Sequence, residues 1–243
     1  MMRVMERGLH TRGAMKTHAL PLALAAGLIA RAPLAAQRSP GGEPLPQLAQ
    51  ELFLAETVYA QERGDVQLTA FTRIQDGTHA RLLGEYGITD RLQLSLVTPA
   101  LEDDPDGEEE AWEPGVLYAL LPDASPVAVS VTLDASLAHG QAPRWESALI
   151  AARRFGRVQL HGSVGTDLGE PGDVTGTLAA LVDAGRLTPT LEGVWASGED
   201  DYAVPGLFAH LARDVEVGVG VPLCIHCAGS PPQQVRAMFT VEF

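Results

Sequence analysis

From residue 65 to the C-terminus, apolar and polar residues alternate in a series of short segments. Within 127–136, valine, leucine and alanine occupy the odd positions, and mostly small polar residues occupy the even ones. Successive side chains of a β-strand point to opposite faces, so each segment has one apolar and one polar face. The pattern predicts about twelve strands, at residues 66–74, 80–88, 91–96, 115–121, 127–136, 145–155, 157–164, 174–182, 187–196, 202–211, 215–221 and 235–243.

The predicted strands are joined by connections that are short and long in turn. The short ones cover residues 89–90, 122–125, 156, 183–185 and 212–214, and the longer, polar ones cover 75–78, 100–114, 139–144, 167–173, 197–201 and 224–231. An even number of strands with this alternation is typical of an antiparallel up-and-down β-barrel, with tight turns at one end and longer loops at the other.

Charged residues stand at mid-length on the polar faces of these strands. On a soluble barrel they would form a solvated surface, because a soluble barrel turns its apolar face inward. In a lipid-embedded barrel they line an aqueous lumen instead, and the closed sheet satisfies the backbone groups that hydrocarbon cannot. We favour an all-β, antiparallel up-and-down transmembrane β-barrel of about 12 strands. Its pore-lining candidates are Arg73, Arg81, Glu85, Asp134, His161, Glu192, Glu216 and Arg236.

Aromatic residues make up only 5% of the chain, yet several fall near the ends of predicted strands. Membrane barrels place tyrosine, tryptophan and phenylalanine in girdles at the two lipid interfaces. Chance placement in so small a sample is the alternative interpretation. The residues in question are Tyr86, Phe155, Trp195, Tyr202 and Phe243.

The N-terminus has the pattern of an export signal. Met15 and Lys16 precede an apolar run over 19–30, and small residues follow up to Ala36. This predicts a signal peptide over 1–36, with Met15 as the true start, and the run is too short for a membrane anchor. We expect residues 37–64 to be a periplasmic lead-in or linker before the barrel domain at 65–243. Whether this lead-in plugs the barrel stays open.

The formal net charge is −14, from 17 basic and 31 acidic residues. A nucleic-acid partner is therefore not expected, because phosphate binding needs a basic surface. Part of the negative charge forms a dense acidic loop over 102–110. A solvated outer loop is the simplest interpretation. The alternative is divalent-cation binding that bridges to lipopolysaccharide phosphates, with Asp104 and Asp106 as weak metal-ligand candidates.

The last nine residues, 235–243, resemble the C-terminal strand of Gram-negative outer-membrane barrels. In that class, a terminal phenylalanine with alternating apolar residues is read by the barrel-assembly machinery, which implies this role for Phe239, Val241 and Phe243. Residues 85–94 and 52–64 are similar to parts of putative outer-membrane transporters in the phenol-degradation meta-pathway group. The resemblance implies a barrel in the cell outer membrane with a transport role, and it names no solute.

Cys224 and Cys227 are the only cysteines, and they lie in the last long connection. In an oxidising compartment a disulfide is the default for such a pair. A soft metal held together with His226 is the alternative, but no fourth ligand for a closed zinc site is evident. We expect no cofactor.

These features predict a passive channel or transporter for small solutes, with outer-membrane lipid and lipopolysaccharide as surroundings. The alternative is a non-conducting structural or binding barrel that works through its outer loops. A third hypothesis, an outer-membrane hydrolase, has only His161 and Ser163 on one strand face to support it. No nucleophile elbow accompanies them, so we expect no enzymatic activity.

Overall fold

The computed structural model describes residues 47–74, 78–99, 111–121, 127–169, 173–197, 200–227 and 234–243. The expected signal peptide over 1–36 and the acidic stretch 102–110 lie outside the described residues. Every named element in the described part is a β-strand, and it contains no helix that is long and apolar enough to cross a membrane.

The strands follow the alternating segments closely. Three of them, β1, β8 and β9, have the predicted bounds, and the ends of the other predicted strands differ by three residues or fewer; the short β12 was not predicted. They are β1 (Val66–Ile74), β2 (Thr78–Thr89), β3 (Leu92–Val97), β4 (Glu113–Leu121), β5 (Ala128–Ser136), β6 (Arg144–Phe155), β7 (Val158–Asp167), β8 (Val174–Val182), β9 (Leu187–Ala196), β10 (Asp201–Ala212), β11 (Val215–Gly220), β12 (Leu223–His226) and β13 (Val235–Glu242).

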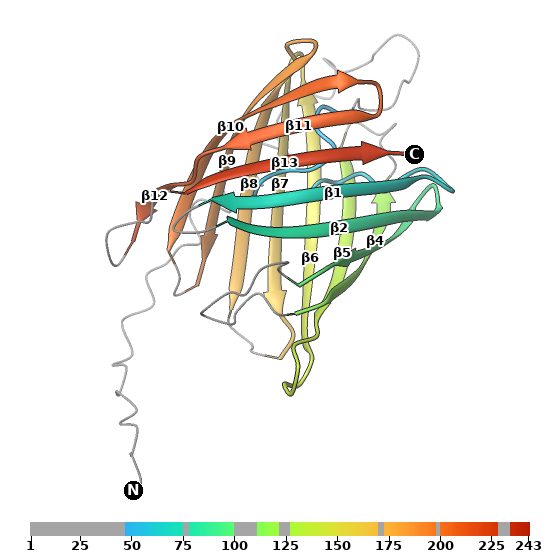
Figure 1. The fold of residues 1–243 in the computed structure, drawn as a ribbon, viewed down its shortest axis with the longest axis vertical. Coiled ribbons are helices and arrows are strands. Elements are labelled where there is room, and N and C mark those ends of the chain that lie inside the picture. Colours follow the sequence, from blue (N-terminus) through green and yellow to red (C-terminus); the bar gives the residue numbers. More distant parts are fainter. Residues whose placement is uncertain are drawn as a thin grey trace, which may run out of the picture. The chain divides into compact units, whose positions relative to one another are not determined.

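These strands form one closed antiparallel barrel (Figure 1). Each strand from β1 to β9 pairs with the next one along the chain, β10 pairs with β11, and β11 pairs with β13. β13 then pairs with β1, which completes a ring of 12 strands. The sequence prediction of an up-and-down barrel is confirmed.

The short strand β12 continues β11 and does not add a position to the ring. β10 is the partner of both, with Gly206 opposite Gly220 and Ala203 opposite Leu223, so one register runs through the two pairings. The interruption falls at Pro222, which has no backbone N–H to donate to a neighbouring strand.

The barrel is closed by the two ends of its own sequence. Phe243 donates its N–H to the carbonyl of Val66 at 2.8 Å and accepts the Val66 N–H at 3.2 Å. The remaining register between β1 and β13 runs from Gln67 opposite Glu242 to Ile74 opposite Val235. Closure leaves no sheet edge exposed at this point, which is what a sheet in hydrocarbon requires.

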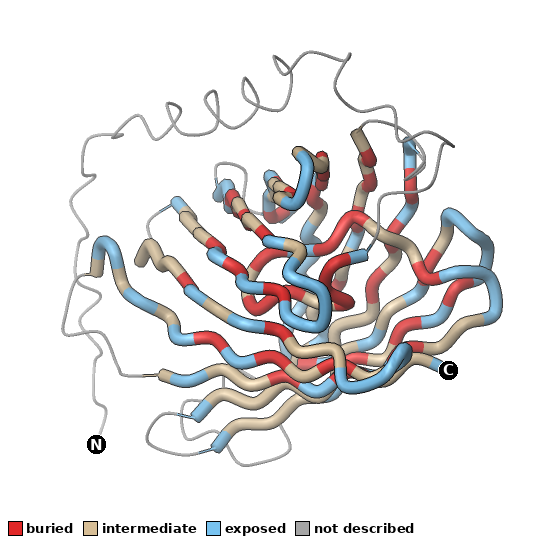
Figure 2. Tube along the Cα trace, turned by 90° about the horizontal axis from the view of Figure 1, so that it is seen from above, coloured by how far each residue is buried: buried red, intermediate tan, exposed pale blue. Residues whose placement is uncertain are grey.

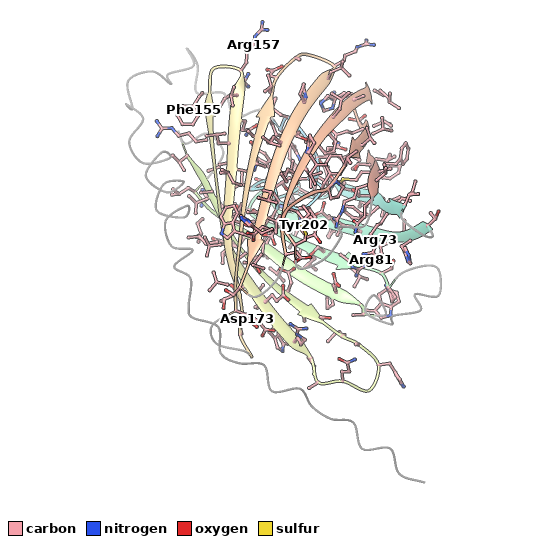
Figure 3. The ribbon with its side chains drawn as sticks, turned by 90° about the vertical axis from the view of Figure 1, so that its left-hand side faces the viewer. Arg73, Arg81, Phe155, Arg157, Asp173 and Tyr202 are labelled. Carbon is pink, nitrogen blue, oxygen red and sulfur yellow. A yellow bond between two sulfur atoms is a disulfide. The ribbon has the colours of Figure 1, made fainter. Side chains whose placement is uncertain are left out.

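The connections separate into a turn end and a loop end. Figure 3 labels Phe155 and Arg157 at the turn end and Asp173 at the loop end. The β6–β7 turn is tight because Gly156 adopts a positive φ of 62°, which is easiest for glycine. One connection differs from the expectation: between β1 and β2 only residues 75–77 intervene, so this connection is not one of the longer ones.

The apolar faces point outward. Large aliphatic side chains there are strongly exposed, with Leu149 at 53% and Leu191 at 55%, while polar residues of the opposite face are buried. Figure 2 shows buried and exposed residues in turn along the strands. A contiguous exposed apolar surface on this scale is unusual for a soluble monomer and fits contact with lipid.

The aromatic residues follow the girdle expectation only in part. Tyr86 and Phe243 are exposed on the outward face, as are Trp112 and Trp145 at the loop end. Tyr202 shares its strand face with the buried Val204 and Phe208 of β10, so it points inward and its assignment to a girdle was wrong.

Residues 47–64, here called the internal segment, pack against the inward face of the barrel. Leu48, Leu52, Phe53 and Val58 are each less than 8% exposed, and they belong to two apolar clusters shared with the strands. The sequence left open whether the lead-in plugs the barrel; residues 47–64 lie inside it, where the inward faces of the strands bury their apolar side chains.

Candidate functional site

The candidate site is the barrel lumen, and all eight predicted pore-lining residues lie on the inward face of their strands. The most buried are His161, Glu192 and Glu216, at 1%, 0% and 2% exposure. The others share their strand faces with buried or cavity-lining residues, and they are Arg73, Arg81, Glu85, Asp134 and Arg236. Their placement follows from the two-residue repeat of each strand. Their role in a pore stays a prediction.

Phe53 anchors the first half of the internal segment. Its ring stacks on Phe208 of β10, with 4.7 Å between the ring centroids. Space for the ring comes from glycines on the facing strands, since a Cβ added at Gly206 or Gly220 would stand 2.5 or 2.9 Å from it. The room that these small inward residues leave is therefore filled in part by the Phe53 ring.

Glu192 of β9 fixes the backbone of the same half. Its carboxylate accepts the N–H groups of Phe53, Leu54 and Ala55 at 3.0, 2.7 and 3.0 Å. On the other side, Nη1 of Arg236 donates to the Phe53 carbonyl at 2.9 Å. Hydrogen bonds to ionised groups are about twice as strong as neutral ones, so this pair of contacts holds the segment firmly.

The start of the segment is held near the turn end. Glu216 accepts the N–H of Gln50 at 3.1 Å and lies 3.2 Å from Nδ1 of His210. His210 is also 3.2 Å from the carbonyl of Leu48. Sequence reasoning named Glu192 and Glu216 as lumen residues but missed that they bind the internal segment, because no local pattern links them to residues 48–55.

The second half of the segment is bound mainly by polar side chains. The Gln61 N–H donates to Gln93 at 2.8 Å, and its side-chain amide donates to Gln67 at 2.7 Å. The hydroxyl of Ser130 donates to the Val58 carbonyl at 2.6 Å. The segment therefore touches strands all around the ring before it enters β1.

Acidic side chains surround one cavity of the lumen, here called the acidic chamber. It has a volume of about 380 Å³ and adjoins a second cavity of about 200 Å³, with which it shares Glu56, Asp134 and Glu146. Arg144, at the rim of both, pairs with Asp167 at 3.1 Å. The carboxylates that line the two cavities are Glu51, Glu56, Glu85, Glu113, Asp134, Glu146, Asp167 and Asp173.

Two of these carboxylates belong to the internal segment. Desolvation within the barrel, followed by repulsion from Asp134, raises the pKa of Glu56 to about 7. Desolvation and the neighbouring Glu85 raise the pKa of Glu51 well above its usual range. Crowded carboxylates of this kind hold protons at a pH where exposed ones are ionised.

A third cavity, here called the basic pocket, has a volume of about 270 Å³ and the opposite charge character. It lies between β1, β2, β13 and the internal segment. Arg73 and Arg81, which lie side by side in Figure 3, both line it. His79 and Arg236 complete its basic wall.

His161 and Ser163 do not form a catalytic pair. Ser163 shares a hydrogen bond of 2.7 Å with Thr177, and His161 lies edge-on to the Tyr59 ring at 5.8 Å. Within the described part of the chain, neither ring nitrogen of His161 has a hydrogen-bond partner. A nucleophile needs a base within hydrogen-bond reach, so these residues give the hydrolase hypothesis no support.

Cys224 and Cys227 form a disulfide. Nδ1 of His226 instead faces Asp201 at 3.3 Å. The described residues contain no group of three or more histidine, cysteine, aspartate or glutamate residues that is placed to hold a metal ion. The other weak metal candidates, Asp104 and Asp106, lie outside the described residues.

The three residues expected to guide assembly lie on the final strand or directly after it. Phe239 and Phe243 are exposed on the outward side, at 47% and 71%, and Val241 shares their strand face. Their recognition by the assembly machinery stays a prediction.

The fold resembles that of solved outer-membrane porins, whereas no family model and no curated protein sequence matches the chain. The KdgM porin has 13% identity and a TM-score of 0.53, with 73% of this chain and 98% of the porin covered. An outer-membrane channel from Pseudomonas putida F1 has 10% identity and a TM-score of 0.52, with 76% and 98% covered. At these identities the likeness concerns the fold, which is that of an outer-membrane porin-like β-barrel.

Proposed function

We propose that the protein is a channel in the cell outer membrane that carries small solutes through its polar lumen. The observation that carries the proposal is the distribution of side chains, which is the reverse of that in a soluble protein. Charged residues lie inside the closed barrel, and aliphatic residues lie on its outer surface. The fold of porins and channels and the export signal expected over 1–36 support this location. We also propose that the outer loops lie against lipopolysaccharide and that the assembly machinery inserts the barrel.

The internal segment restricts the path that such a solute can take. It crosses the lumen and is bonded to opposite walls, so passage runs through the acidic chamber and the basic pocket beside it, or requires the segment to move. We therefore infer a narrow channel of low conductance.

Conductance in planar lipid bilayers tests this proposal. The protein without residues 1–36 should give small channel steps, and removal of residues 47–64 should enlarge them several-fold. A heat-dependent shift on SDS gels checks that each barrel is closed and folded. Should the deletion not fold, Phe53→Ala provides the same comparison. Arg213→Gln at the exposed turn end is the control and should leave the steps unchanged.

The internal segment also favours the second candidate, a non-conducting barrel that binds a partner through its outer loops. Absence of channel steps in the wild type and in both segment variants, with folding confirmed, would overturn the channel and leave this candidate. The similarity of residues 85–94 and 52–64 to the phenol-degradation transporter group supports the transport function. In the structure these two regions adjoin, since Gly64 donates its N–H to the Gly87 carbonyl at 2.8 Å.

A further inference from the structure

The register of β2 to β5 aligns two carboxylates of the acidic chamber in one row. Glu85 of β2 lies opposite Ser95 of β3, which lies opposite Gly115 of β4. Gly115 in turn lies opposite Asp134 of β5. A Cβ at Gly115 would collide with the Asp134 carboxylate and the Ser95 hydroxyl, so Asp134 extends along the row toward Glu85. Because neighbouring strands are about 4.8 Å apart, at most roughly 14 Å separates the backbones at the two ends of the row.

The internal segment adds a second carboxylate at each end of this row. Nε2 of Gln67 donates to Glu51 at 3.0 Å and to Glu85 at 2.6 Å, so these two carboxylates lie side by side. They are here called the first acidic pair. At the other end, desolvation followed by repulsion from Asp134 raises the pKa of Glu56 to about 7, which places these two carboxylates close together. Glu56 and Asp134 are here called the second acidic pair.

The chamber keeps an excess of negative charge. Within the described part of the chain, no arginine or histidine forms an ion pair with either acidic pair. Arg144 is the only basic residue among the described residues that line the two cavities, and it pairs with Asp167. The stretches 75–77, 100–110, 122–126, 170–172, 198–199 and 228–233 contain no lysine, arginine or histidine that could neutralise this charge. In residues 37–46, Arg38 is the only basic residue and Glu43 balances it.

The buried hydroxyl of Thr132 lies beside the second acidic pair. Thr132 stands two residues before Asp134 on the inward face of β5, is 7% exposed and lines both the acidic chamber and the adjoining cavity. Its hydroxyl oxygen makes no hydrogen bond of normal geometry to any described residue. A buried polar atom without a partner is unfavourable, and an N–H donor of a bound molecule would supply that partner.

The spacing of the charges favours an organic dication over a metal ion. The described residues contain no group of three or more carboxylate, histidine or cysteine side chains that is placed to hold a metal. A small ion can meet only one acidic pair at a time, whereas a molecule with two ammonium groups can meet both. Leu83 of β2 and Leu117 of β4 flank the row, line the chamber and are each 8% exposed. They offer apolar surface to the carbon chain between two such groups.

We propose that the acidic chamber binds a linear organic diamine. One ammonium group lies at each acidic pair, and the ammonium group at the second pair also donates to the Thr132 hydroxyl. The methylene chain lies against Leu83 and Leu117. The proposal names a solute class for the channel proposed above and rests on that function for its role in transport. Binding itself can be measured without transport.

Isothermal titration calorimetry of the detergent-solubilised full chain with 1,6-diaminohexane tests the proposal. The titration is made at pH 8, because the pKa of Glu56 is about 7 and most of this carboxylate is then ionised. Injection into empty micelles gives the background heat. We expect saturable binding to the wild type. Hexylamine lacks the second charge, 1,6-hexanediol lacks both charges, and adipate reverses them. Each should bind at least about tenfold more weakly, because charged hydrogen bonds are lost.

Magnesium chloride is the competing probe for a metal ion. It should bind more weakly than the diamine, because the carboxylates are spread along the row rather than gathered around one point. Tighter binding of magnesium than of the diamine would overturn the proposal.

Variants locate the binding. Asp134→Asn should weaken the binding of 1,6-diaminohexane about tenfold, and Thr132→Val should weaken it about threefold, since a charged contact contributes more than a neutral one. The matched control is Asp90→Asn at the exposed β2–β3 turn, which should bind like the wild type. If Asp134→Asn lacks the heat-dependent gel shift, Glu56→Gln on the internal segment replaces it.

The proposal is also overturned by the absence of saturable binding to the wild type, by wild-type affinity in the carboxylate variant, or by hexylamine or adipate binding as tightly as the diamine. Conductance in bilayers tests the channel separately. Diamine binding without any channel steps would leave the site intact and remove transport. Channel steps without diamine binding would overturn the site and leave the channel.

Discussion

The two halves of the internal segment are held in the lumen by different interactions. Leu48 to Ala55 bury apolar side chains against β8 to β13 and give three backbone N–H groups to one carboxylate. Val58 to Gln61 rely more on glutamine and hydroxyl hydrogen bonds, beside a smaller apolar cluster. Water can replace polar partners but not apolar ones. The first half should therefore dominate the free energy that keeps the segment in place.

Phe53→Ala should cause the largest loss. It removes the ring stacked on Phe208 and leaves a cavity lined by glycines, a change that costs roughly 3 kcal/mol in buried sites. Amide hydrogen exchange of Phe53, Leu54 and Ala55 measures the free energy of local opening. Leu149→Ala on the outward face is the control. Unchanged exchange in the Phe53 variant would contradict a dominant first half.

Glu192→Gln should have the next largest effect, roughly 2 kcal/mol on the same exchange measurement, because an amide cannot accept three N–H groups as a carboxylate does. Glu216→Gln provides the graded comparison, since Glu216 accepts only the N–H of Gln50 from the segment backbone. Its effect should be smaller. Equal effects of both variants would show that the three-fold contact at Glu192 has no special weight.

Gln93→Ala acts on the second half and should cost about 1 kcal/mol, the net value of a neutral hydrogen bond. Exchange of the Gln61 amide should accelerate, while that of Leu54 should stay as in the wild type. The matched control is Gln141→Ala in the exposed β5–β6 loop. An equal acceleration at Leu54 would mean that the two halves of the segment open together, and it would contradict their being held independently.

The pH dependence should be the smallest effect, since the Glu56 side chain is exposed and solvent screens its charge. Its pKa, raised to about 7 by desolvation and Asp134, means that the seated segment binds a proton more tightly than a released one. The stability of the state in which the internal segment is bound in the lumen is therefore fully present below pH 4.5 and falls as the pH rises through 7. Local exchange should be faster at pH 8 than at pH 6, after correction for intrinsic rates. Glu56→Gln should reduce this difference, and the remainder should come from Glu51, whose pKa is raised as well.

The strands of the barrel wall could be predicted because the alternation of neighbouring residues determines both the strand and the face of each residue. In Val66 to Ile74 apolar and polar residues alternate, so the strand bounds and the inward face follow without knowledge of any partner. Charged residues such as Glu192 are placed by the same rule. The exception, Tyr202, lies near a strand end, where both an inward and an interfacial position fit its composition.

The position of the internal segment inside the barrel could not be predicted, because it depends on contacts with residues far away in the sequence. Phe53 fits only where Gly206 and Gly220 come together, and these positions are more than 150 residues away in sequence. Residues 47–64 have no two-residue repeat and no helical repeat that would mark a buried element. A cluster of leucine, phenylalanine and alanine without regular structure was the only signal available.

The pairing of the first strand with the last constrains the order in which the barrel can fold. Leu48, Leu52 and Phe53 precede every strand in the sequence, yet several of their partners lie on β9 to β13, at the end of the chain. Until β13 pairs with β1, the barrel is open and these apolar side chains cannot be fully buried. The internal segment can therefore reach its final position only when the barrel closes around it. Because contacts between residues far apart in sequence form slowly, we expect closure to be the slow step of folding.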